Sequence, residues 1–291
     1  MPIIRDYATV AFGQMHVRRA GDGPPAILLH QSPESSASLI PLIDKVAERN
    51  AVVAPDMPGY GQSDALPGTP EVIQFADAIA QCMTALGIDQ AAVYGVHTGA
   101  AVAAALAHQH PHRVSIAVLD GLPFWTDDEQ RDLLRYYLPE IEPRIDGGHL
   151  TWTWWRVLQQ SAYFPWYDTR PEARTDLPYP DAQATHARVL DMLTASAGGG
   201  YPAGYAAAFR FVAEPVVQHL SVPTVLLYRR EDVLAPHALR VPHVRPACVR
   251  VETIDADQMP ARTAQLLAGG AAATDVVTAL PGTRTQEDPE T

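Results

Sequence analysis

Lysine and cysteine are scarce in this chain. Lys45 is the only lysine, and the 21 basic residues face 33 acidic ones, for a formal net charge of −12. Because phosphate binding needs clustered cations and no such cluster occurs, we expect no nucleic acid partner. The two cysteines, Cys82 and Cys248, lie in apolar runs, which favours reduced thiols over a structural disulfide.

Long hydrophobic runs, signal segments and phosphate loops are also missing. No run approaches the about 20 apolar residues that a membrane span needs. The opening MPIIRDYATV lacks the apolar stretch and cleavage site of a secretory signal. No glycine-rich loop of the Walker or Rossmann type occurs, so no nucleotide cofactor is expected. We therefore expect a cytoplasmic protein with no membrane partner and no cofactor, and the sequence does not indicate its oligomeric state.

The chain does contain the pattern of an α/β domain. Its 291 residues are 47% hydrophobic and 19% charged, which is typical of globular proteins. Short buried runs of the strand type alternate with helical segments. The expected strands are Ala26–His30, Ala51–Ala54, Ala91–Val96, Val114–Leu119, Pro223–Tyr228 and Cys248–Ile254, and the expected helices of the first half are Leu39–Arg49, Val72–Leu86 and Thr98–His108. This alternation predicts a doubly wound, mostly parallel sheet.

The pattern changes between residues 122 and 215. All five tryptophans lie here, and strand-like runs return only after this segment. We interpret residues 122–215 as a helical cap inserted into a core formed by residues 1–121 and 216–270. The alternative, an independent second domain, would require the sheet to end at Leu119. Residues 271–291 finish in a polar stretch that predicts a partly disordered tail.

One short motif points to chemistry. Gly95-Val96-His97-Thr98-Gly99 follows a buried strand and opens an alanine-rich helix. A tight turn of the G-x-S-x-G type needs both glycines, and it pushes the central side chain out above the sheet in a strained conformation. That geometry suits a residue that reaches substrate. In this chain the exposed side chain is the imidazole of His97.

With its neighbours, this motif resembles the α/β-hydrolase superfamily, over nearly all of the chain up to about Gly270. The matching segments, in family order, are His30-Gln31-Ser32-Pro33 at the oxyanion loop, Pro55–Asp64 (PDMPGYGQSD), the elbow at residues 95–99, the helical cap, and Tyr228-Arg229-Arg230-Glu231-Asp232 at the place of the triad acid. The H-Q-S-P loop and G-x-H-T-G elbow also resemble a subgroup of hydrolase-like proteins. The resemblance implies an α/β-hydrolase fold, an enzyme, and a site above the sheet.

Two positions depart from the family pattern. His97 stands where the nucleophilic serine is usual. Gln258, in Asp257-Gln258-Met259-Pro260, stands where the resemblance places the catalytic histidine. Glutamine has no accessible protonation change and cannot act as a general base, and a triad needs such a base. Ordinary serine-esterase chemistry is therefore not expected.

The sequence suggests a different role for His97. At a helix N-terminus the macrodipole disfavours a positive charge, which favours a neutral imidazole with one nitrogen free as base or nucleophile. We hypothesise that the carbonyl of Gln258 accepts the His97 N–H while its amide donates to Asp232, which would fix the tautomer. The alternative is a decayed site in which His97 merely fills space.

The turns beside His97 predict an oxyanion site. By resemblance, the backbone N–H groups of Ser32 and Thr98 are the donors, and such a pair stabilises an enolate or a tetrahedral oxyanion. Gln31 replaces the customary glycine, so its side chain either perturbs the loop or adds a contact. His30 is expected to support this loop rather than to catalyse.

Further candidates come from the strand ends and the cap. Asp120 is a second acid candidate beside Asp232, with a plain turn residue as the alternative. His149 would be a second acid–base group if it faces His97 across the pocket, and a structural cap residue otherwise. The tryptophans of the cap, Trp152 and Trp155 among them, are expected to pack the cap, with one or two walling a pocket for a flat, apolar or aromatic substrate.

A metal site is not expected. His108, His110 and His112 alternate around Pro111, a spacing that invites a metal interpretation. They fall at the end of the helix that follows the elbow, far from the active end of the sheet. We therefore interpret them as part of a structural turn.

These features leave several functions open. The leading hypothesis is a cofactor-free enzyme in which His97 is a general base or nucleophile on a small apolar or aromatic molecule, with lyase, cyclase or oxygenase chemistry. A second is ester or lactone hydrolysis through an acyl-imidazole. A third, from another class, is a hydrolase fold that binds a ligand without turnover. The fold alone does not decide among them.

Overall fold

A computed structural model describes residues 2–175, 177–243 and 245–269, so the tail predicted for residues 271–291 lies outside the described residues. The described chain forms an eight-stranded sheet. Its strands are β1 (Ile4–Val10), β2 (Gly13–Ala20), β3 (Pro25–Leu29), β4 (Ala51–Pro55), β5 (Ala91–Val96), β6 (Val114–Asp120), β7 (Thr224–Arg229) and β8 (Val249–Ile254).

The sheet is mostly parallel, as the alternation of buried runs predicts. The strand order is β1-β2-β4-β3-β5-β6-β7-β8, and the pairs from β4 to β8 are parallel. The hydrophobic pattern did not reveal β1 and β2, which form an antiparallel hairpin. Strand β1 is exposed along most of its length, so it lacks the continuous apolar run by which a buried strand is found.

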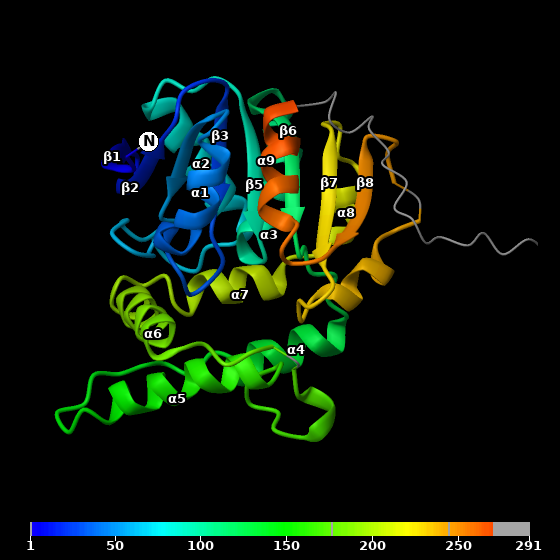
Figure 1. Cartoon of the computed structure of the whole chain (residues 1–291). Coiled ribbons are helices and arrows are strands. Elements are labelled where there is room, and N and C mark those ends of the chain that lie inside the picture. The colour runs from blue at the N-terminus through cyan, green and yellow to red at the C-terminus, as the bar shows by residue number, and fades with distance from the viewer. Residues whose placement is uncertain (1, 176, 244, 270–291) are drawn as a thin grey trace, which may run out of the picture.

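Helices cover both faces of the sheet. The core helices are α1 (Ile40–Val46), α2 (Val72–Ala85), α3 (Thr98–Gln109), α8 (Ala213–Gln218) and α9 (Met259–Gly269). Helices α1 and α9 contribute to one hydrophobic cluster and α2, α3 and α8 to the other (Figure 1). The small side chains of α3 explain its central place, because every residue from Thr98 to Ala107 is buried.

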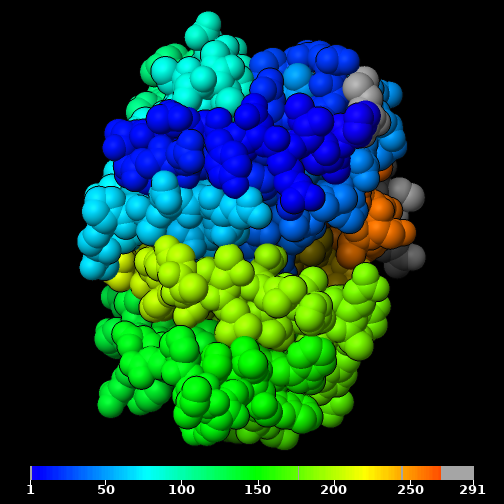
Figure 2. All heavy atoms as spheres, turned by 90° about the vertical axis from the view of Figure 1, so that its left-hand side faces the viewer, coloured from blue at the N-terminus to red at the C-terminus, as the bar shows by residue number. Residues whose placement is uncertain are grey.

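Between β6 and β7 the chain leaves the sheet and forms a helical insertion, residues 122–215. It contains α4 (Asp127–Tyr136), α5 (Gly148–Ala162), α6 (Ala182–Ala197) and α7 (Ala203–Arg210), besides the start of α8. Helix α4 begins with a capping box of Thr126 and Glu129, which satisfies two orphan donors. Helices α4 to α7 stack beneath the sheet layer in Figure 1, and Figure 2 shows the same two layers from the side. Short 3₁₀ segments complete the described chain at Ser36–Leu39, Pro111–Arg113, Pro171–Ala173 and Ala235–Arg240.

The strand register brings the segments that follow four of the parallel strands to one edge of the sheet. Leu29 pairs with Gly95 and Val96 pairs with Asp120, which in turn pairs with Leu227. The residues that follow β3, β5, β6 and β7 therefore meet at the carboxyl ends of the parallel strands, where ligands bind in open α/β sheets.

Two smaller findings concern the membrane and the thiols. No helix within the described ranges is long and apolar enough to cross a bilayer. Cys82 and Cys248 are both free thiols. Burial raises the pKa of the Cys82 thiol to about 12, so this group is not a nucleophile near neutral pH.

Candidate active site

The elbow has the conformation that its sequence predicts. His97 precedes α3 with φ 48° and ψ −106°, and it is the one non-glycine residue with positive φ in the described chain. A Cβ on Gly95 would lie 2.1 Å from the Gly99 carbonyl oxygen, and a Cβ on Gly99 would lie 2.3 Å from the Leu29 carbonyl oxygen. Both glycines are therefore required for the turn. The His97 side chain remains 24% exposed and lines a cavity.

The acid after β7 binds His97 directly. His97 Nε2 lies 3.0 Å from both Oδ1 and Oδ2 of Asp232. The Leu234 N–H donates to Asp232 Oδ1 at 2.8 Å and fixes the carboxylate. The predicted bridge through Gln258 is wrong, because the two groups meet without an intermediary and Gln258 is exposed in a turn.

Arg229 joins the two candidate acids. Its Nη2 lies 2.6 Å from Asp232 Oδ2 and its Nε lies 3.2 Å from Asp120 Oδ1. Tyr94 Oη donates to Asp120 Oδ2 at 2.7 Å. Asp120 is fully buried and holds Arg229, whereas Asp232 is the acid that contacts the His97 ring. The sequence offered no signal for Arg229 beyond its place beside the acid motif.

The charges of this network act on His97. Burial lowers the pKa of the imidazole. The charge of Asp232 and the hydrogen bond to it together outweigh this effect, so the net shift of the pKa is upward. Burial raises the pKa of Asp232, and the charges of His97 and Arg229 together bring it below its usual range. The expectation that the helix dipole favours neutral His97 is thus corrected. A carboxylate in contact outweighs the partial charge of a helix end.

The predicted oxyanion loop lines the same cavity as this pair. Gln31, Ser32 and Thr98 line the same cavity as His97. The amide of Thr98 belongs to the first turn of α3, where an N–H group has no intrahelical acceptor. Ser32 is buried and its Oγ is 2.6 Å from Tyr60 Oη.

His30 supports this loop from below. It is fully buried, its Nε2 accepts the Met57 N–H at 2.8 Å, and its Nδ1 is 2.9 Å from the Gln31 carbonyl oxygen. An imidazole that accepts at Nε2 must donate from Nδ1, so the ring is neutral with a defined tautomer. Burial lowers the pKa of His30, which keeps the ring neutral.

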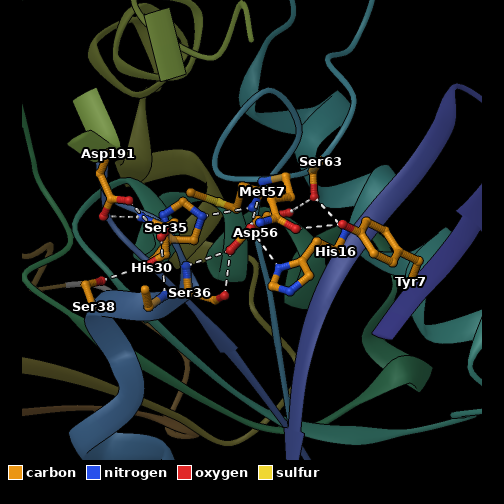
Figure 3. Close-up of polar contacts among 12 residues, drawn as sticks. Tyr7, His16, His30, Ser35, Ser36, Ser38, Asp56, Met57, Ser63 and Asp191 are labelled. Atoms are coloured by element: carbon orange, nitrogen blue, oxygen red, sulfur yellow. Dashed lines mark hydrogen bonds and ion pairs between the residues drawn. The ribbon is translucent and has the colours of Figure 1, made fainter. Parts of the chain in front are cut away.

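A polar network continues behind the loop, as Figure 3 shows. Asp56 accepts the Ser36 N–H at 2.8 Å and lies 2.9 Å from His16 Nδ1. Asp191, on α6 of the helical insertion, accepts from the Ser35 N–H at 3.2 Å and from Ser35 Oγ at 3.0 Å. The loop is therefore held from the core and from the insertion together. No sequence signal had singled out Asp191.

The cavity has a volume of about 290 Å³, and aromatic side chains form part of its wall. The aromatic residues that line it are Trp125, Tyr137, Phe164, Tyr205 and Phe209. The prediction that Trp152 and Trp155 wall the pocket is wrong, because neither residue lines the cavity. The buried stripe of α5 passes through Arg156 and Val157 instead. Trp155 is 61% exposed, and Trp152 is 36% exposed and packs edge-on against Trp166.

The other predicted histidines lie outside the cavity lining in the described chain. His149 accepts the Arg144 N–H at Nδ1, 3.0 Å away, and so closes the turn before α5 instead of facing His97. His110 Nε2 lies 2.8 Å from Asp77 Oδ1. No group of three or more metal-ligand side chains occurs within the described ranges.

The family follows from a sequence comparison. The model of the alpha/beta hydrolase fold family matches residues 24–242, which span the sheet from β3 to β7 and the whole helical insertion. The chain belongs to the α/β-hydrolase family.

Curated relatives within the α/β hydrolases match part of the chain. An uncharacterised protein of Mycobacterium tuberculosis is 32% identical over 123 residues, 40% of this chain and 36% of the relative. Haloalkane dehalogenase 2 of the same organism is 31% identical over 117 residues, 40% of this chain and 41% of the relative. A 2-(acetamidomethylene)succinate hydrolase of Mesorhizobium japonicum is 30% identical over 135 residues, 46% of each chain. The chain thus spans less than half the length of these relatives.

Solved α/β hydrolases match nearly the whole chain in structure. Epoxide hydrolase A of Mycobacterium thermoresistibile has a TM-score of 0.66 and 17% identity, covering 88% of this chain and 92% of that one. The enol-lactonase of Burkholderia xenovorans has a TM-score of 0.63 and 17% identity, covering 89% and 96%. At these identities the likeness shows the fold.

This α/β hydrolase therefore presents a histidine–aspartate pair in a cavity that Ser32, Thr98 and several aromatic side chains also line. Nε2 of His97 faces Asp232, and a Cβ on Gly121 would lie 2.7 Å from His97 Cδ2. The Nε2–Cδ2 edge of the ring is thus occupied by protein. Nδ1, on the other side of the ring, is the nitrogen that remains to accept a proton or attack a carbon.

Proposed function

We propose that this protein is a cofactor-independent enzyme in which His97 removes a proton from a small, largely apolar or aromatic compound. The contact between His97 Nε2 and Asp232 carries the proposal. With Nε2–H donated to the carboxylate, the neutral ring keeps its lone pair on Nδ1. Asp232 then stabilises the imidazolium that forms when Nδ1 takes the proton.

The surroundings suit a reaction that develops negative charge on oxygen. The amides of Ser32 and Thr98 would receive an enolate or phenolate oxygen once the proton has moved to Nδ1. Aromatic side chains wall the cavity, and an apolar site strengthens such electrostatic contacts. The helical insertion acts as the cap that excludes water. Elimination, cyclisation, carbon–carbon cleavage and addition of oxygen to the resulting carbanion all begin with this step.

Hydrolysis is the second candidate, and the names of the relatives favour it. A haloalkane dehalogenase and a succinate-derivative hydrolase resemble parts of the chain, and an enol-lactonase shares its fold. In this alternative Nδ1 of His97 attacks an ester or lactone carbonyl, and water then hydrolyses the acyl-imidazole. A third candidate, ligand binding without turnover, would use the same aromatic cavity.

One comparison of variants tests these candidates. Wild type, His97→Asn and His149→Asn are incubated in deuterated buffer with enolisable ketones and phenols, and separately with activated esters and lactones. His149 is the matched control because it lies in the helical insertion outside the cavity lining. The readouts are deuterium incorporation into the small molecule, product release, and the intact mass of the protein.

Each outcome points to one candidate. Deuterium exchange at the α-carbon of the ketones, or turnover of the ketones or phenols, in wild type and in His149→Asn but not in His97→Asn supports the general base. Ester hydrolysis with the same dependence, and an acyl adduct on the protein, supports the hydrolase and contradicts the leading proposal. Turnover that persists in His97→Asn contradicts both roles of His97. Binding without exchange or hydrolysis in wild type supports the binder.

A further inference from the structure

The helical insertion buries a cation next to the cavity. Arg156 on α5 is 1% exposed, and its guanidinium lies 4.9 Å from the ring centroid of Tyr137 and 4.3 Å from that of Trp166. Its Nη1 donates to Gln160 Oε1 at 2.7 Å. Its Nε and Nη2 are buried and have no hydrogen-bond partner within the described chain.

A buried guanidinium of this kind is costly unless its charge is compensated. The faces of Tyr137 and Trp166 supply part of the compensation, and the Gln160 carbonyl supplies one acceptor. None of these three groups carries a negative charge. The positive potential of Arg156 is therefore not cancelled locally, and it extends through its neighbours into the low-dielectric cavity.

Gln160 connects this cation to the cavity. Because Gln160 Oε1 faces Arg156, its amide nitrogen Nε2 faces the other way, 3.3 Å from Tyr205 Oη. Both Gln160 and Tyr205 line the cavity. An amide NH₂ carries two hydrogens, so one remains after the contact with Tyr205. The orientation of Gln160 thus presents a donor to a ligand, and Arg156 enforces that orientation.

The other arginines of the cavity are already neutralised by carboxylates. Arg229 contacts Asp120 and Asp232, and Arg188 lies 3.5 Å from Glu34. The strand end of the cavity also carries the acids Asp232 and Glu231. An anionic group of a ligand is therefore repelled at the strand end and attracted at the wall formed by α5.

We infer that Gln160 and Arg156 form a subsite for a carboxylate, so that the ligand is a small aromatic or apolar carboxylic acid. Gln160 Nε2 donates to the carboxylate, and the charge of Arg156 stabilises it through the amide. The part of the inference that places the reacting atom of this acid next to His97 rests on the proposed function. The preference for an anion at this wall does not.

Matched pairs of small molecules test the subsite. The probes are benzoate with benzamide and phenylacetate with phenylacetamide, whose binding is measured by calorimetry at a pH where the acids are ionised. A charge-assisted hydrogen bond should make each carboxylate bind about tenfold more tightly than its amide. Binding is measured without turnover, so its failure is distinguishable from failure of the role proposed for His97.

Two substitutions of Gln160 test the subsite, one that introduces a negative charge and one that removes the polar group. Gln160→Glu places a carboxylate against Arg156, and the attraction between the two groups should preserve the fold. This variant should lose carboxylate binding and retain amide binding. Gln160→Leu should reduce the preference toward unity. Gln159→Glu is the matched control, because it adds the same charge on the same helix outside the cavity lining. Equal binding of both members of each pair by wild type would overturn the subsite. So would a carboxylate preference that survives Gln160→Glu.

Discussion

Nε2 of His97 lies 3.0 Å from each carboxylate oxygen of Asp232. In the pattern that the chain resembles, a histidine supplied after the last strand lies between the nucleophile and the acid. Here the histidine at the elbow reaches the acid by itself. Gly121 leaves the necessary space, because a side chain there would meet the His97 ring. His97 thus contacts the acid without a second histidine between them, and Gln258 stands exposed in a turn.

The ionisation of His97 should depend on Asp232. The carboxylate raises the pKa of the imidazole against the effect of burial, so Asp232→Asn should lower that pKa. Catalysis by the neutral ring is lost as the pH falls through the His97 pKa. The acidic limb of the rate profile should therefore move to lower pH in Asp232→Asn, and the maximal rate should fall about 100-fold because the imidazolium loses its stabilising charge.

An NMR titration of the His97 ring, with His149→Asn to assist assignment, measures this pKa without any substrate. Asp120→Asn is a useful comparison, since Asp120 contacts Arg229 and not the ring. It should move the His97 pKa in the same direction by a smaller amount. An unchanged His97 pKa in Asp232→Asn would contradict the coupling.

Gly121→Ala should displace the imidazole. A Cβ at this position would lie 2.7 Å from His97 Cδ2 and 3.0 Å from His97 Nε2. The ring must therefore leave Asp232, and a misplacement of about 1 Å costs about 100-fold in rate. The measurement is kcat/KM of the folded variant, together with the His97 ring resonances.

Gly87→Ala separates this clash from backbone strain. Gly87 has φ +70°, close to the +64° of Gly121, but a Cβ there would have nothing within 4 Å. Both substitutions should cost about 1 kcal/mol of stability through the positive φ. Only Gly121→Ala should lose activity, and equal kcat/KM for the two variants would argue against the role of Gly121.

The sheet could be predicted from the sequence because the inner parallel strands β3 to β7 are largely apolar. The elbow could be predicted as well, because the spacing of its two glycines forms a short motif, although the contact that requires Gly99 is with Leu29, which is distant in sequence. The edge hairpin β1–β2 was missed, since its side chains are half in solvent. Gln31 and Ser32 line the same cavity as His97, and His30 holds their loop through its hydrogen bonds; the role of this loop as an oxyanion site stays a prediction.

The lining of the cavity could not be predicted in the same way. Trp152, Trp155 and Gln160 lie on one helix, and which of them faces the sheet depends on how α5 rotates against its neighbours. That rotation is set by contacts distant in sequence, such as that of Gln160 with Tyr205. The role of Arg229 was also not predicted, because it arises from two acids distant in sequence from each other, Asp120 at the end of β6 and Asp232 in the loop after β7.

The aromatic wall gives a prediction about ligand size and shape. Trp125→Ala and Phe164→Ala should weaken binding of phenylacetamide about tenfold, because each ring lines the cavity and the two stack on each other. Trp152→Ala and Trp155→Ala should leave binding unchanged, since neither residue lines the cavity. Calorimetry of the four variants measures this, after circular dichroism confirms the fold. Weaker binding in the Trp155 variant would support the prediction from the sequence that Trp155 walls the pocket.

Asp191 should make the contact between α6 and the oxyanion loop dependent on pH. Burial raises the pKa of Asp191 to about 6, although Ser35 donates two hydrogen bonds to it and lowers that pKa in part. An acid with a raised pKa in the folded state favours folding while protonated, and this contribution is lost as the pH rises through about 6. Asp191→Asn lacks this titration. The stability of the variant relative to wild type should therefore increase by about 1 kcal/mol between about pH 4.5 and about pH 8. Urea unfolding at several pH values measures the difference, and a difference that stays flat or falls with pH would show that Asp191 ionises in the folded protein without this cost.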